Sequence, residues 1–199
     1  MTMRIIALAA ALLCFTTTAR AEEYFFPQVG MTVLSVDGWT VVSGQDFIAM
    51  NQKASFGTDD LDGILHSYTD APIFSMLSEI RDNSGVRAGF NVFAFEGALP
   101  DIDAAAKNIE DYLLQSFRDA ELVRPWKHSS LGGEPAMHLA LTYTVDIQDS
   151  ASQSIYEEMW LIPRKTNYVT VSYGTLESDT DPELWRDLRR TLNSVAWTN

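Results

Sequence analysis

The sequence AMHLALTYTVDI at residues 136–147 alternates large apolar side chains with small or polar ones at every second position. This period of two is typical of a β-strand whose two faces meet different surroundings. A second apolar run, IYEEMWLI at 155–162, and a third, YVTVSY at 168–173, follow after short connections. Short connections join antiparallel neighbours, so the stretch from Ala136 to Gly174 predicts a three-stranded antiparallel meander.

Pairing these strands about their loops predicts which side chains lie opposite one another. The expected partners across the first two strands are Val145–Tyr156, Tyr143–Glu158, Leu141–Trp160 and Leu139–Ile162. Those across the second and third strands are Ile162–Val169, Trp160–Val171 and Glu158–Tyr173. In this register one face of the meander is apolar and the other is small and polar, and a slip of one residue would exchange the faces.

The rest of the chain supplies further short strands and two helices. We expect strands at 31–36, 39–43, 46–51, 73–80 and 88–95, and a loop at 119–135. Apolar residues spaced three or four apart predict a helix over 102–117, with Asp101 or Asp103 capping its first turn. Asp181-Pro182-Glu183 predicts the start of a last helix. The strand at 88–95 is apolar on both faces, which implies a layer on each side of the sheet.

Residues 1–21 have the features of an export signal. Arg4 supplies a positive start, residues 5–15 an apolar run, and Ala19-Arg20-Ala21 a small-x-small cleavage site. Cys14 raises the alternative of a lipoprotein, but Leu13 stands where a lipobox has a small residue. We therefore expect a soluble periplasmic or secreted protein, with residues 22–199 forming a single domain without a cysteine.

The charge of the chain disfavours two classes of partner. The formal net charge is −13, and it becomes −15 once residues 1–21 are removed, because they contain Arg4, Arg20 and no acidic residue. An acidic protein repels phosphate backbones and anionic lipids, so we expect neither nucleic-acid binding nor stable membrane insertion after signal cleavage. The partner we expect is another envelope protein.

Several short motifs resemble one known superfamily. Gly38-Trp39 follows the first expected long strand, and Gly89-Phe90-Asn91-Val92 precedes the long helix. Leu131-Gly132-Gly133-Glu134-Pro135-Ala136 leads into the meander, and the closing helix ends in Leu192-Asn193-Ser194. Together they resemble the PsbP-like superfamily, which includes extrinsic photosystem II subunits and exported DcrB-like bacterial proteins. The similarity covers about Met31 to Val195, and residues 52–87 match no part of it.

The resemblance implies an α+β fold arranged as an α/β/α sandwich. Its sheet would be mostly antiparallel, with one helix between strands and another at the C-terminus. It also implies an accessory or binding role rather than catalysis, and it assigns no functional residue to this chain.

Two groups of residues are candidate ligand or partner sites. Trp126, Lys127 and His128 form a basic, aromatic cluster that either anchors a partner or, as the alternative, covers the edge of the core with Lys127 in solvent. The second group is the polar face of the meander, which is either covered by a helix or forms the floor of a cleft. Its residues are Thr142, Thr144, Glu157, Thr170 and Ser172.

The sequence contains no signature of a catalytic or metal site. It has no Gly-x-Ser-x-Gly elbow, phosphate-binding glycine loop or His-Glu-x-x-His helix. Residues 58–69 resemble a calcium loop superficially but lack its final bidentate carboxylate. We therefore expect no enzyme activity, no metal and no cofactor.

Our interpretation is an exported, non-catalytic accessory or binding protein that acts through protein or small-ligand contacts. One alternative is an immunity or inhibitor protein whose acidic surface caps a basic partner. A third possibility is a hydrolase that uses Glu157 or Glu158 with His138. From the predicted register, Glu158 is either buried and hydrogen-bonded by Tyr143 and Tyr173 or, as the alternative, reaches water at a frayed end of the sheet.

Overall fold

The computed structural model describes residues 21–52, 54–59, 72–79, 86–147 and 151–198. Within them an eight-stranded sheet has the strand order β3-β5-β6-β10-β9-β8-β4, and β7 also pairs with β8. A separate three-stranded sheet has the order β1-β2-β11. Every pairing is antiparallel. The elements are β1 (Glu23–Phe26), β2 (Met31–Leu34), β3 (Thr40–Val42), α1 (Gly44–Asn51), β4 (Ala54–Ser55), β5 (Phe74–Leu77), β6 (Gly89–Glu96), α3 (Ile102–Ser116), β7 (Arg118–Leu131), β8 (Glu134–Ile147), β9 (Gln153–Pro163), β10 (Asn167–Leu176), α4 (Pro182–Ser194) and β11 (Ala196–Trp197).

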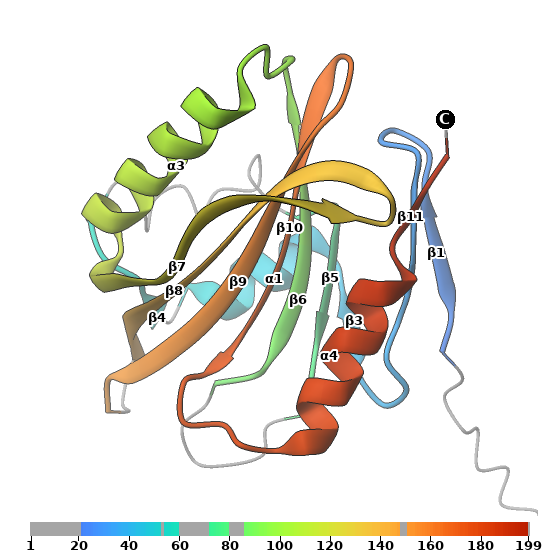
Figure 1. Cartoon of the computed structure of the whole chain (residues 1–199). Coiled ribbons are helices and arrows are strands. Elements are labelled where there is room, and N and C mark those ends of the chain that lie inside the picture. The colour runs from blue at the N-terminus through green and yellow to red at the C-terminus, as the bar shows by residue number, and fades with distance from the viewer. Residues whose placement is uncertain (1–20, 53, 60–71, 80–85, 148–150, 199) are drawn as a thin grey trace, which may run out of the picture.

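Layers cover both faces of the large sheet, as the doubly apolar strand β6 predicts. Helix α4 and the three-stranded sheet lie on one side, and α3 lies on the other (Figure 1). Leu184 and Leu188 of α4 belong to a core with Trp160 and Val171. Leu113 of α3 packs in a second core with Leu139. The predicted α+β sandwich with a mostly antiparallel sheet is therefore confirmed.

Both predicted helices form, and their N-terminal caps are the expected aspartates. The Asp101 side chain accepts a hydrogen bond from the backbone N–H of Ala104 at 3.0 Å. Asp181 accepts one from the N–H of Glu183 at 2.8 Å, with Pro182 in the first turn. Within the described part of the chain, no helix is long and apolar enough to cross a membrane.

The predicted register between β9 and β10 is confirmed. Ile162 lies opposite Val169, Trp160 opposite Val171, and Glu158 opposite Tyr173. The loop that joins these strands is short, so it leaves little freedom for a slip.

The predicted register between β8 and β9 is wrong by three residues. Leu141 lies opposite Glu157 instead of Trp160, and His138 is the residue opposite Trp160. An odd shift exchanges the faces, so Thr142 and Thr144 lie on the Trp160 side of the sheet. The physical reason is that both faces are buried: the α3 side takes the large residues of β8, and the small Ala136 and Ala140 fit the opposite side.

Two segments have a different secondary structure from the one predicted. Residues 46–51, expected as a strand, belong to α1, because the Ser43 hydroxyl caps the helix by accepting from the N–H of Asp46 at 3.2 Å. Residues 119–131, expected as part of a loop, belong to β7, a 14-residue strand along the edge of β8. Its register shifts at three places, and Asp119 has a φ of 52°, so its apolar period is broken and gives no strand signal.

Candidate functional site

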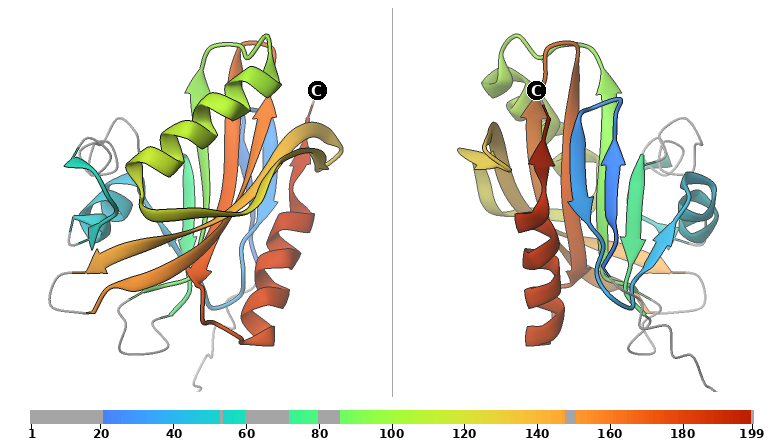
Figure 2. Two further views of the ribbon diagram at one scale, coloured as in Figure 1. Left: turned by 60° about the vertical axis from the view of Figure 1, so that its left-hand side comes forward. Right: turned by 90° about the vertical axis from the view of Figure 1, so that its right-hand side faces the viewer.

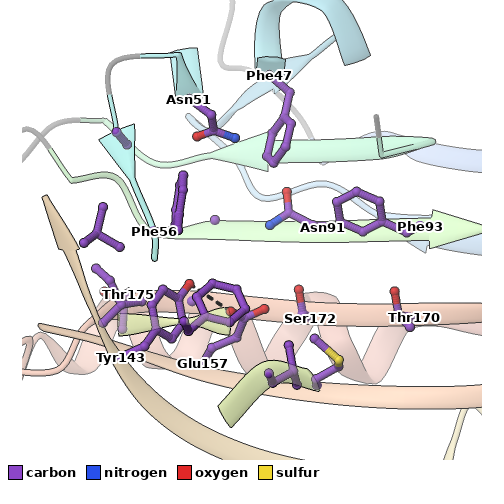
Figure 3. Close-up of a pocket in the computed structure, with 18 of the residues that line it drawn as sticks. Phe47, Asn51, Phe56, Asn91, Phe93, Tyr143, Glu157, Thr170, Ser172 and Thr175 are labelled. Carbon is purple, nitrogen blue, oxygen red and sulfur yellow. Dashed lines mark hydrogen bonds between the residues drawn. The ribbon is translucent and has the colours of Figure 1, made fainter. Parts of the chain in front are cut away.

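A pocket of about 610 Å³ lies on the α3 side of the large sheet. The strands β6, β8, β9 and β10 supply its floor and walls, and α1 and α3 supply its sides. Figure 2 shows these two helices beside the large sheet, and Figure 3 shows side chains that line the pocket. The side chains that line it are mostly apolar and aromatic, with a few polar groups among them. The aromatic and apolar ones are Phe47, Met50, Ala54, Phe56, Leu77, Val86, Phe93, Phe95, Ile109, Tyr112, Leu113, Phe117, Tyr143, Val145, Ile147, Ile155, Met159 and Tyr168.

The alternation of three central strands brings the polar groups to the floor. Ser172 of β10 lies between Asn91 of β6 and Met159 of β9 in the pairing register. Two residues along β10, Thr170 presents a second hydroxyl on the same face. Figure 3 shows the Ser172 hydroxyl across from the Asn91 amide, Thr170 across from Phe93, and the Glu157 carboxyl on the other side of Ser172.

Among the described residues that line the pocket, Glu157 is the one acidic side chain. The Tyr143 hydroxyl donates to Glu157 Oε2 at 2.9 Å, and Ser172 is its second hydrogen-bond partner. Burial raises the pKa of Glu157, while the hydrogen bonds from Ser172 and Tyr143 act in the opposite direction. The pKa of Tyr143 is raised well above 10, first by burial and then by the negative charge of Glu157.

Aromatic rings contact one another around the pocket. Phe93 packs edge-on against Phe47 of α1, with ring centroids 6.2 Å apart, and stacks on Phe95, also at 6.2 Å. On the α3 side, the Phe117 ring lies 4.3 Å from that of Tyr143. Met50 of α1 and Tyr112 of α3 are 39% and 42% exposed, although both line the pocket, so its rim is apolar as well.

The structure divides the predicted polar face of the meander between the two sides of the sheet. Glu157, Thr170 and Ser172 line the pocket. Thr142 and Thr144 lie on the opposite face, because the observed register places Thr142 beside Tyr156. The expectation that all five share one face is therefore wrong.

The predicted Trp126-Lys127-His128 cluster lies on β7 and does not line the pocket. Trp126 is half-buried and packs at the edges of the two cores beneath α3. Lys127 is exposed, and His128 Nε2 lies 3.1 Å from a carboxylate oxygen of Asp103 on α3. These positions match the alternative in which Trp126 covers the core edge and Lys127 is solvated.

Several pocket residues are absent from the sites that the sequence predicts. Phe47 and Asn51 lie in the segment expected as a strand, although Ser43 followed by Asp46 is a recognisable helix-capping signal. The predicted register places Tyr143 on the opposite face. Phe93 and Phe95 are expected on a shared buried face, and that face is the pocket wall.

A second polar cluster lies on the opposite face, one residue along β9. Glu158 Oε2 is 2.7 Å from His138 Nε2 and 3.5 Å from Arg124 Nη1, and the Tyr156 hydroxyl donates to Oε1 at 2.7 Å. The His138 ring stacks on Trp160 with centroids 4.3 Å apart. Burial alone would raise the pKa of Glu158, but hydrogen bonds from His138, Tyr156 and Tyr173 outweigh it and lower the pKa to about 2.

Glu158 is therefore hydrogen-bonded as expected, but one of its two expected tyrosine partners is wrong. Tyr156, with Tyr173, takes the place expected for Tyr143, which donates to Glu157 instead. The described residues contain no group of three or more His, Cys, Asp or Glu side chains that could hold a metal ion. The expected signal peptide and the loop at 60–69 lie outside the described residues, apart from Ala21.

Neither a protein-family model nor a curated protein sequence matches this chain. Solved structures are similar to it. The crystal structure of LpqN, involved in cell envelope biogenesis of Mycobacterium tuberculosis, matches with a TM-score of 0.56 at 10% identity, over 90% of this chain and 91% of LpqN.

The solution structure of cyanobacterial PsbP (CyanoP) from Synechocystis matches with a TM-score of 0.51 at 15% identity, over 92% of this chain and 96% of CyanoP. Because the sequence identities are this low, the structural similarity establishes the fold alone. The chain therefore has the PsbP-like fold, an α/β/α sandwich.

Proposed function

We propose that this chain is an exported accessory protein that acts by binding, without catalysis, and that the pocket between α1 and α3 holds its ligand. The pocket itself carries the proposal. Its volume of about 610 Å³ lies within the range of about 300–1,000 Å³ that is usual for small-molecule sites. Apolar walls with a few converging polar groups are the usual composition of such sites.

The rim of the pocket supports an apolar ligand in particular. Exposed Met and Tyr side chains at Met50 and Tyr112 would offer an apolar entrance to a molecule that is poorly soluble in water. The export-type N-terminus and the involvement of LpqN in cell envelope biogenesis support a place in the cell envelope.

An environment-sensitive apolar dye tests the proposal. The protein without residues 1–21 should bind the dye with a single saturable site and a strong rise in fluorescence. Ser172→Leu should abolish most of this rise, because a larger side chain on the floor fills the pocket. Thr142→Leu is the matched control, since it adds similar volume on the opposite face of the same sheet.

Circular dichroism and thermal melting establish that both variants are folded. Dye binding that is equally strong in Ser172→Leu and the wild type would contradict the proposal. Mass spectrometry of small molecules that co-purify with the native protein from its envelope fraction would then identify the natural ligand of a confirmed pocket.

The second candidate function is hydrolysis at the pair formed by His138 and Glu158. Their 2.7 Å contact is the observation that favours it. We favour a stabilising role for this pair, because His138 is buried against Trp160 and the carboxylate is also hydrogen-bonded by tyrosine. Turnover of a panel of ester and amide substrates by the wild type, lost in His138→Gln, would support the hydrolase instead.

A further inference from the structure

Two adjacent glutamates on β9 differ in their ionic partners. Glu158 lies within 4 Å of Arg124 and His138, both of which can carry positive charge. Glu157 takes part in no ion pair within the part of the chain that the structure describes. Its hydrogen-bond partners, Tyr143 and Ser172, are neutral. Glu157 is therefore a carboxylate in an apolar pocket, and no cation among the described residues balances it.

Such an arrangement is costly unless something else compensates it. A buried carboxylate is normally paired or coordinated, because transfer of a charge out of water is unfavourable. Two hydroxyl donors offset part of this cost, and they leave acceptor capacity unused, because a carboxylate has about four lone-pair sites. Burial raises the pKa of Glu157, and donation from the two hydroxyls opposes this effect.

Arg87 is the one cationic side chain among the described residues that line the pocket, and it is directed to other groups. Its Nε donates to the carbonyl oxygen of Ser78, and its Nη2 lies 3.5 Å from the Thr40 hydroxyl. Both acceptors belong to the β3–β5 end of the sheet. Among the described residues, therefore, no cationic side chain is directed at Glu157, and a ligand could supply the balancing positive charge.

We propose that the pocket takes an apolar amine, whose ammonium group binds Glu157 and whose hydrocarbon body lies among the phenylalanine rings. The ammonium would donate to the free acceptor sites of the carboxylate in a charge-assisted hydrogen bond. The ring of Tyr143, whose hydroxyl donates to Glu157, and the Phe117 ring packed against it add faces that attract cations. The body would extend along the floor past Ser172 towards Phe93 and Phe47 (Figure 3). This inference rests on the proposed binding function of the same pocket.

Three ligands of equal chain length test the proposal: decylamine, decanol and decanoate, each kept below its micelle-forming concentration. Isothermal titration of the protein without residues 1–21 should rank them in that order. Hydrogen bonds to charged groups account for an expected preference for the amine over the alcohol of about 10- to 100-fold. Decanoate should bind weakest, because its carboxylate would meet that of Glu157.

Glu157→Gln is the decisive variant, since an amide keeps the size of the side chain and still accepts from Tyr143. It should abolish the preference for decylamine over decanol, because the amide carries no charge to attract the ammonium group. Glu158→Gln is the matched control, one residue along the same strand but on the other face, and it should keep the full preference.

Three other outcomes are possible, and each would contradict the amine assignment, the proposed binding function, or both. Decanol or decanoate binding as tightly as decylamine to the wild type would overturn the amine assignment and leave the binding function standing. Retention of the amine preference by Glu157→Gln would overturn the amine assignment in the same way. Failure of all three ligands to bind would contradict the proposed function itself, and the amine assignment with it.

Discussion

Residues 157 and 158 show how much the surroundings of a side chain decide about its chemistry. The same carboxyl group, on consecutive positions of β9, faces an apolar pocket in one case and a hydrogen-bonded cluster in the other. Burial acts on both. The pKa of Glu157 is raised, whereas that of Glu158 is lowered to about 2, because only the latter has enough donors to outweigh the loss of water.

The lowered pKa of Glu158 predicts a pH dependence of stability. Its pKa is about 2 in the folded protein and 4.5 as the reference for the unfolded chain, so the folded state favours the ionised form. The stabilising contribution is therefore complete above pH 4.5 and is lost as the pH falls towards 2. Denaturant unfolding at a series of pH values measures it.

The variant Glu158→Gln should be less stable than the wild type at pH 6, and this difference should shrink as the pH falls from 4.5 to 2. The exposed Glu23→Gln is the control, and its difference from the wild type should stay small throughout. A gap between wild type and Glu158→Gln that is constant over this range would show that Glu158 is not held in its ionised form.

Trp160 is a second residue with a measurable contribution. It is 5% exposed, packs in the core with Val171 and Leu184, and stacks on His138. Trp160→Ala should lower the free energy of unfolding by about 3–5 kcal/mol, because it leaves a cavity that the neighbours cannot fill. A denaturant midpoint close to that of the wild type would mean that this side chain is outside the core.

At the scale of the elements, the sequence predicts helices and strand registers correctly where capping residues and short loops agree with the tertiary packing. Helix α4 begins at its predicted cap, and β10 pairs with β9 in the predicted register, since local sequence signals define both. The register of β8 against β9, and with it the choice of which β8 face lies beside Trp160, could not be derived in the same way. Both faces of β8 are buried, so apolar alternation does not say which face lies with Trp160.

The pocket illustrates the same limit. Three of the eight predicted site residues line it (Glu157, Thr170 and Ser172), because they alternate along strands whose mutual register the sequence predicts correctly. The side chains from α1 and β8 are not predictable in this way, because a helix replaces an expected strand and the β8 register differs from the expected one. The β8 register depends on tertiary context, so Tyr143 carries no local signal that would reveal its neighbours. The helix that carries Phe47 does have a local signal, the capping pair Ser43 and Asp46, which the strand prediction did not use.

The stability of helix α1 should affect ligand binding in the pocket. Ser43→Ala removes the cap that holds the first turn, which should cost about 1 kcal/mol. Since Phe47, Met50 and Asn51 of this helix line the pocket, the affinity for the apolar dye should fall as well. Titration with the dye measures this loss.

Asp181→Ala is the control, because it removes the corresponding cap of α4 on the other side of the sheet. It should lower stability by a similar amount and leave dye affinity unchanged. If Ser43→Ala binds the dye as tightly as the wild type does, α1 does not contribute to the binding site.

At the scale of the whole molecule, the arrangement separates two tasks. The core between the large sheet, α4 and the three-stranded sheet contains most of the large buried side chains, such as Phe90, Met31 and Leu184. The α3 side retains the open pocket. A ligand can therefore enter one side of the sheet while the packing on the other side stays intact.

Export is the prediction that concerns the full chain. We expect the mature protein to begin at Glu22, since Ala19 and Ala21 fit the small-residue requirement of signal cleavage. Intact-mass measurement of the protein recovered from the envelope checks this. A mass that corresponds to lipid attached at Cys14 would assign the protein to the membrane-anchored class instead.

The irregular edge strand β7 has a consequence for how copies of this molecule behave at high concentration. Regular exposed edges invite another strand to add, and so lead to aggregation. The three register shifts of β7 interrupt the even row of backbone groups that an incoming strand would need, and exposed Glu121 and Lys127 place charge along it. A long strand can thus form the margin of the sheet without acting as a template for polymerisation.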